Sequence, residues 1–144
     1  MIVRNAAIAA LALLAAACGE DTCPTESPQV SQVADCTVRP GAAVSYPVQL
    51  CPTCNQTGAT CDVDTSAVGP GSGDIFLDPK VEVCTAATSC PPTCDVTPFA
   101  CTFDAPTVEG NYTVSVVNGA SGAVVTRTLR VSATESVSCA LVPT

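Results

Sequence analysis

The chain has 144 residues, and its five Lys and Arg against thirteen Asp and Glu give a net charge of −8 at pH 7. Eleven Cys, with twelve Pro and nine Gly, are typical of a disulfide scaffold from an oxidising compartment and argue against a cytosolic protein. The acidic balance argues against nucleic acid as a partner and against membrane binding through charge, because phosphates and anionic headgroups repel such a surface.

The chain begins with the pattern of a signal peptide. Arg4 supplies a positive charge, residues 6–14 form an apolar run, and three alanines precede Cys18. This run fits the apolar region of a signal peptide, and it is too short for a transmembrane helix, which needs about 20 residues. We therefore predict that residues 1–17 are removed.

The residues before Cys18 resemble the lipobox of bacterial lipoproteins, in which the cysteine is diacylated on its sulfur and cleavage occurs just before it. That family usually has Leu three residues before the cysteine, where this chain has Ala15. The resemblance implies that Cys18 anchors the protein to the cell envelope of a Gram-negative-type bacterium, at the outer membrane. Two or more acyl chains are enough for stable attachment. Ala15, Ala16 and Ala17 also fit an ordinary signal peptidase site, which would leave Cys18 as a thiol.

The cysteine count favours the anchor. Without Cys18, an even number remains, so every thiol can pair; these ten are Cys23, Cys36, Cys51, Cys54, Cys61, Cys84, Cys90, Cys94, Cys101 and Cys139. We predict three pairs, because Cys84 and Cys101 border strands while Gly58 and the Pro91-Pro92 turn let short segments double back: Cys84 with Cys101, Cys54 with Cys61, and Cys90 with Cys94. These pairs argue against a bond between Cys51 and Cys54.

The first half of the mature chain contains one clear strand. Residues 19–32 are polar and interrupted by Pro, which is typical of a tether, and an edge strand tied down by Cys23 is the alternative. Strict alternation then predicts a half-buried strand whose inward residues are Val44, Tyr46, Val48 and Leu50, with Pro47 at an edge or a bulge. We expect a long, covalently pinned loop over residues 51–74, which hold three Cys and four Gly.

The second half is richer in β patterns. Val81 and Val83 alternate with charged residues, and residues 90–94 predict a second pinned turn. Tyr112, Val114 and Val116 then alternate with outward residues, and Asn118-Gly119 predicts a hairpin turn into a strand at 123–133. The mature chain shows no convincing helical period.

Residues 103–133 resemble the closing strands of bacterial immunoglobulin-like domains, with an Ala-Pro strand end, a Gly-x-Tyr-x-Val strand, a turn and a last alternating strand. Tyr112 matches the tyrosine-corner position of such folds loosely. The resemblance implies a small immunoglobulin-like β-sandwich. Since the chain has only three Phe, two Tyr and no Trp, we expect a thin core that depends on disulfides.

Two cysteine motifs could carry chemistry. Cys51-Pro-Thr-Cys54 resembles the active site of periplasmic disulfide oxidoreductases, but that chemistry needs a helix directly after the motif, and residues 55–61 hold a Gly and a third Cys instead. The same two cysteines with Cys90 and Cys94 have the spacing of a zinc site, against which the oxidising compartment argues.

Three acidic residues with hydroxyls between them, Asp62, Asp64 and Asp74, offer oxygen ligands suited to calcium. This stretch lacks the Gly and the terminal Glu of an EF-hand loop, so a solvated loop is the simpler interpretation. Since the chain has no His, a Ser-His or Cys-His catalytic arrangement is excluded.

These patterns together predict an all-β, disulfide-rich protein. We divide it into a signal peptide (1–17), a lipidated N-terminus with a tether (18–32), and a disulfide-stapled β domain (33–144). We expect a non-catalytic envelope lipoprotein without a cofactor, whose domain binds or supports an envelope protein or surface ligand. The alternative is a thiol-disulfide redox accessory that uses Cys51 and Cys54.

Overall fold

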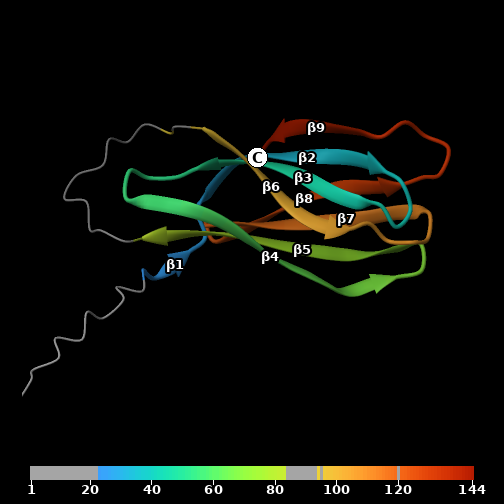
Figure 1. Cartoon of the computed structure of the whole chain (residues 1–144), viewed down its shortest axis with the longest axis horizontal. Coiled ribbons are helices and arrows are strands. Elements are labelled where there is room, and N and C mark those ends of the chain that lie inside the picture. The colour runs from blue at the N-terminus through green and yellow to red at the C-terminus, as the bar shows by residue number, and fades with distance from the viewer. Residues whose placement is uncertain (1–22, 84–93, 95, 120) are drawn as a thin grey trace, which may run out of the picture.

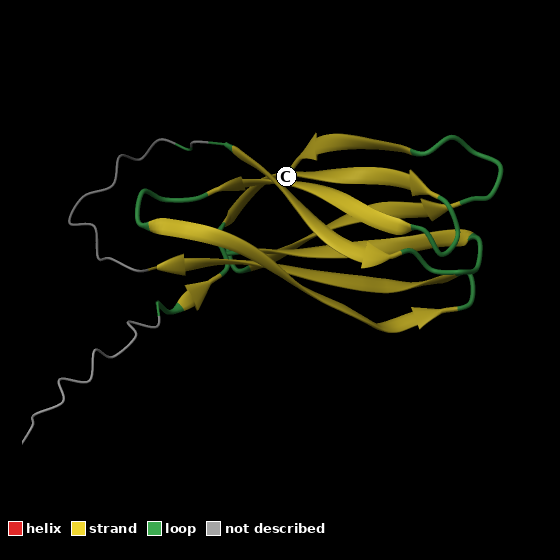
Figure 2. Ribbon diagram, in the orientation of Figure 1, coloured by secondary structure: helices red, strands yellow, loops and turns green. Residues whose placement is uncertain are grey.

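The structure is a computed structural model that describes residues 23–83, 94, 96–119 and 121–144. Every regular element in these ranges is a β-strand (Figures 1 and 2), which confirms the all-β prediction. In chain order the strands are β1 (Thr25–Glu26), β2 (Gln29–Val38), β3 (Ala43–Cys51), β4 (Gln56–Gly69), β5 (Ser72–Val83), β6 (Thr97–Asp104), β7 (Gly110–Asn118), β8 (Ala123–Val131) and β9 (Ser138–Pro143).

The strands form one curled sheet in the order β1-β5-β7-β8-β2-β3-β6, with β4 added beside β5 and β9 beside β2. Strand β2 joins the two halves of the sheet. Its first residues pair antiparallel with β3, and Cys36–Val38 pair parallel with β8. The sheet therefore bends at β2, and the inward side chains of β3 and β6 share one core with those of β5, β7 and β8.

The alternating patterns predicted from the sequence are confirmed in β3 and β7. Val44, Tyr46, Val48 and Leu50 are all buried in β3, and Tyr112, Val114 and Val116 are buried in β7. In both strands the residues between them are more exposed. One face of each strand thus meets the core, as a period of two requires.

The predicted long loop at residues 51–74 is wrong. Most of it is the strand β4, which forms an antiparallel hairpin with β5. The turn is Pro70-Gly71 between the paired residues Gly69 and Ser72, and Gly71 has a φ of 78°. Proline followed by a residue of positive φ is the signature of a type II turn, so the sequence did contain a hairpin signal here.

The N-terminal boundary of the β structure also differs from the prediction. Residues assigned to the tether lie in the sheet: Thr25 and Glu26 pair with Glu82 and Val81 of β5. Strand β2 starts at Gln29, within the tether range, and its Val30 is only 1% exposed. The strand alternative is therefore correct for Thr25 and Glu26, where β1 lies at an edge, whereas the residues from Gln29 onward belong to β2 inside the sheet.

The hairpin expected at Asn118-Gly119 is present between β7 and β8, although its chemistry differs from the expected turn. The side-chain amide of Asn118 donates to the carbonyl of Val30 and accepts from its N–H, at 3.1 and 3.3 Å. A Cβ on Gly119 would lie 1.6 Å from the carbonyl oxygen of Ser27. Asn118 and Gly119 therefore dock the start of β2 against the end of β7, and the positive φ falls at Gly122 instead.

Candidate functional site

Three disulfides join cysteines that are distant in the chain: Cys36 with Cys139, Cys51 with Cys94, and Cys61 with Cys101. Cys23 and Cys54 are also disulfide-bonded. Our predicted pairs are therefore wrong, because Cys61 and Cys101 bond to each other and Cys94 bonds to Cys51. Cys18, Cys84 and Cys90 lie outside the described residues.

The bond between Cys61 and Cys101 closes the curled sheet. It joins β4 to β6, which lie at opposite ends of the sheet and share no backbone ladder. Cys101 is fully buried and Cys61 packs against the core from the edge. We call the line between β4 and β6 the seam.

Two hollows lie along the seam, one on each side of this disulfide. The first, of about 440 Å³, lies between Thr65 and Val68 of β4 and Asp104 of β6 and reaches Tyr112. The second, of about 410 Å³, lies between residues 56–59 of β4 and 97–99 of β6. Its lining includes Leu50 and Val81 from the core and is largely apolar. The seam is thus open to solvent at two places, and the Cys61–Cys101 disulfide joins β4 to β6 between them.

The first hollow has a tyrosine hydroxyl at its wall, and that hydroxyl is fully used. Tyr112 donates to the carbonyl of Val108 at 2.8 Å and accepts from the N–H of Gly71 at 3.1 Å. A tyrosine near the start of its strand that bonds back to a carbonyl four residues earlier has the geometry of a tyrosine corner. The hydroxyl therefore fixes the turn before β7 and the β4–β5 turn.

The other tyrosine is buried in the core. The hydroxyl of Tyr46 donates to the carbonyl of Ala34. Burial raises the pKa of Tyr46 well above its ordinary value, the carboxylate of Asp35 raises it further, and Arg127 opposes both. Tyr46 is a packed structural donor that stays protonated.

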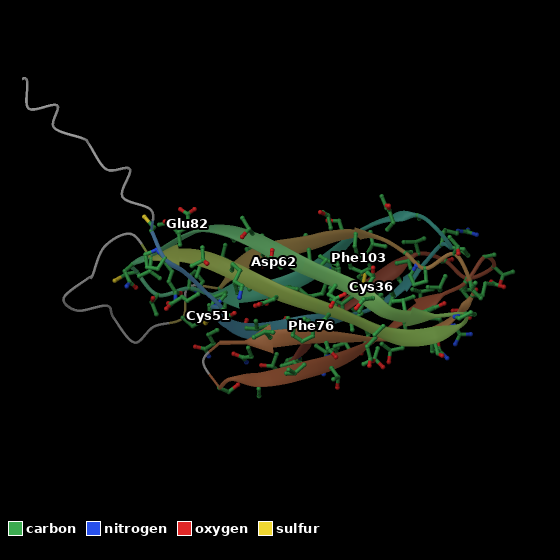
Figure 3. The ribbon with its side chains drawn as sticks, turned by 90° about the horizontal axis from the view of Figure 1, so that it is seen from below. Cys36, Cys51, Asp62, Phe76, Glu82 and Phe103 are labelled. Carbon is green, nitrogen blue, oxygen red and sulfur yellow. A yellow bond between two sulfur atoms is a disulfide. The ribbon has the colours of Figure 1, made fainter. Side chains whose placement is uncertain are left out.

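The candidate redox motif does not have the required geometry. Cys51 bonds to Cys94, and strand β4 begins at Gln56 in place of a helix. Cys51 and Glu82 lie at one end of the sheet (Figure 3). The zinc hypothesis needs free thiolates at Cys51 and Cys94, and the disulfide removes both; its remaining ligand Cys90 lies outside the described residues.

The candidate calcium ligands are spread along the β4–β5 hairpin. Asp62 and Asp64 lie on β4, opposite Asp78 and Phe76, whereas Asp74 lies nearer the turn. The carboxylate of Asp64 accepts from the N–H of Ser66 at 2.8 Å, and this bond lowers its pKa. In the described part of the chain, no group of three or more Asp, Glu, Cys or His residues is placed so that it could bind a metal ion.

Sequence reasoning missed two features of the surface. The strand β9 was not predicted, although residues 140–142 are a short apolar run directly after Cys139. Arg127 also had no assigned role. Its guanidinium donates to the carbonyls of Val142 and Pro143, which ties β8 to β9.

Comparison with known proteins adds no assignment: no family model, curated protein or solved structure matches the chain. Within the described ranges, the structure contains no helix that is long and apolar enough to cross a bilayer.

Proposed function

We propose that this chain is a lipid-anchored protein of a Gram-negative-type cell envelope, whose β domain binds or supports a partner without catalysis. The observation that carries the proposal is the state of the cysteines. All eight described cysteines are disulfide-bonded, which fits an oxidising compartment outside the cytosol. The ten cysteines after Cys18 can all pair, so Cys18 is the one left for an anchor.

We further propose that the domain is a variant of the immunoglobulin-like sandwich. Two observations support this: the tyrosine-corner bond of Tyr112, and the first long strand β2, which is shared between two halves of the sheet. The strand directions differ at two pairs: β5 lies parallel to β7, and Cys36–Val38 of β2 lie parallel to β8, whereas the sheets of an immunoglobulin domain are described as antiparallel. The β4–β5 hairpin is therefore attached to β7 through β5, its second strand.

The anchor is tested by mass spectrometry of the mature N-terminal peptide from envelope membranes. We expect a peptide that starts at Cys18 and carries a diacylglyceryl group. The N-terminal peptide of a Cys18→Ala variant should lack the lipid mass, and the variant should no longer be found in the carbonate-resistant membrane fraction. A wild-type peptide with an unmodified Cys18 thiol would overturn the anchor and leave ordinary secretion.

The non-catalytic role is tested by thiol titration of the folded protein. We expect the disulfides to resist a mild dithiol such as a reduced thioredoxin-like protein. Selective release of the Cys51 thiol under these conditions, with re-oxidation on removal of the reductant, would instead support the redox alternative.

A further inference from the structure

The last strand differs from the other long edges of the sheet. Residues 136–144, which include β9, have no charged side chain in a chain with a net charge of −8. Among the described strands, β9 pairs with β2 alone. Natural edge strands are usually protected by charges, bulges or a covering segment, because unpaired backbone groups invite another strand.

The outward backbone groups of β9 can be assigned from its pairing with β2 and one hydrogen bond. The N–H of Thr144 donates to Ser31 of β2, so every second residue before it faces β2 as well. By the same alternation, Pro143 faces away from β2. By this alternation, Cys139 and Leu141 direct their N–H and C=O groups away from β2, and Val137, which immediately precedes β9, continues the same spacing.

The side chains near these groups are exposed and apolar. Val137 is 62% exposed and Leu141 is 38% exposed. The bond from Cys139 to Cys36 holds the strand rigidly in place, so a partner would find a preformed edge and would not have to order it.

The other long edges do not offer such a surface. The free sides of β4 and β6 face each other at the seam and are joined by the Cys61–Cys101 bond. If two copies paired antiparallel through β4 about a two-fold axis at Val63, Asp62 of one would lie opposite Asp64 of the other, and like charges directly opposite are destabilising.

We propose that β9 is a docking edge for a second copy of this chain, which adds its own β9 in antiparallel orientation about a two-fold axis at Cys139. This register places Val137 opposite the second copy's Leu141 and, by symmetry, Leu141 opposite the second copy's Val137. It also pairs all three outward residues and leaves Pro143, which has no N–H, outside the ladder. An uncharged contact lets two acidic chains approach. Because six residues bury little area, the dimer is weak and transient.

The register is tested by sedimentation of the mature, lipidated chain in excess detergent up to about 1 mM, a range that reports weak dimers. We expect the wild type to dimerise as its concentration rises, with hydrogen exchange slowing at the amides of Cys139 and Leu141. Leu141→Lys and Val137→Glu should each weaken the dimer about tenfold. An equimolar mixture of the two variants should recover it, because the introduced lysine then faces the introduced glutamate.

The matched control is Val124→Lys on β8, because Val124 is similarly exposed at 49% and lies outside β9. We expect it to dimerise like the wild type. The β9 side chains lie outside the core, and circular dichroism should confirm that all the variants fold. A wild type that stays monomeric to about 1 mM, a control as weak as Leu141→Lys, or a mixture that does not recover would each overturn the proposal.

Discussion

Removing the Cys61–Cys101 bond should open the seam and lower the free energy of unfolding by about 3 kcal/mol. This magnitude follows from the loop that the bond closes. Since Cys51–Cys94 is already joined, the shortest path runs ten residues from Cys61 back to Cys51 and seven from Cys94 to Cys101. Chain entropy for a loop of about 17 residues gives about 3 kcal/mol at 25 °C, against about 4 for an isolated loop of 40 residues.

The variant is Cys61→Ser with Cys101→Ala. Alanine is chosen at position 101 because this site is fully buried, and a serine there would have an unsatisfied hydroxyl. Urea unfolding without reductant gives the loss in free energy, and hydrogen exchange gives its location. We expect faster exchange in β4 and β6, since β4 has few buried side chains of its own. Of a total stability of about 5–15 kcal/mol for such a domain, the loss is a large share.

The comparison is the Cys36→Ala, Cys139→Ser variant, which frees β9. Exchange should then rise in β9 and leave the seam protected. A loss under about 0.5 kcal/mol for the seam variant, within the range of ordinary surface substitutions, would refute the view that the bond closes the sheet. The same would follow if both variants increased exchange in the same strands.

Three further changes test individual contacts. Tyr112→Phe removes both hydroxyl bonds and should cost about 1–3 kcal/mol in urea unfolding, because the N–H of Gly71 loses its partner. Gly110→Ala should abolish or severely weaken folding, measured by circular dichroism, since its Cβ would lie 2.0 Å from the carbonyl oxygen of Gly71. The hydrogen bond from the N–H of Ser66 lowers the pKa of Asp64, so NMR should show this carboxylate titrating below its unfolded value of about 3.9. The stability that this hydrogen bond gives the folded protein should be present above that value and be lost as the pH falls through the folded pKa.

The sequence was informative where a strand has one buried face and uninformative where it has none. Val114 and Val116 revealed β7 because the core selects every second residue. Strand β4 is exposed on both faces over much of its length, so its Thr and Asp residues resemble a loop. Its place in the sheet depends on pairing with β5 and on the Cys61–Cys101 bond, and the partner of Cys61 has no local signature.

The disulfide pairs could not be predicted from the sequence near each cysteine, because they too depend on contacts between distant segments. Short closures around Gly58 are sterically open, yet the partner of each cysteine is set by how the sheet curls. Cys36 meets Cys139 because antiparallel pairing places β9 directly opposite β2, with 4.1 Å between the two Cα atoms. That pairing joins residues 103 positions apart, and nothing in either short segment identifies the other.

The composition of the chain explains why specific bonds supplement packing at the edges of the curled sheet. With small aliphatic side chains and two tyrosines as the largest buried groups, packing across the sheet cannot hold its edges together alone. The Cys61–Cys101 bond closes the seam between β4 and β6, and the guanidinium of Arg127 reaches from β8 to the end of β9, which both pair with β2. The covalent closure withstands salt, whereas Arg127 works through two carbonyls and leaves the adjacent backbone of Leu141 and Cys139 open. The free edge of β9, away from β2, is therefore where we propose that a second strand adds.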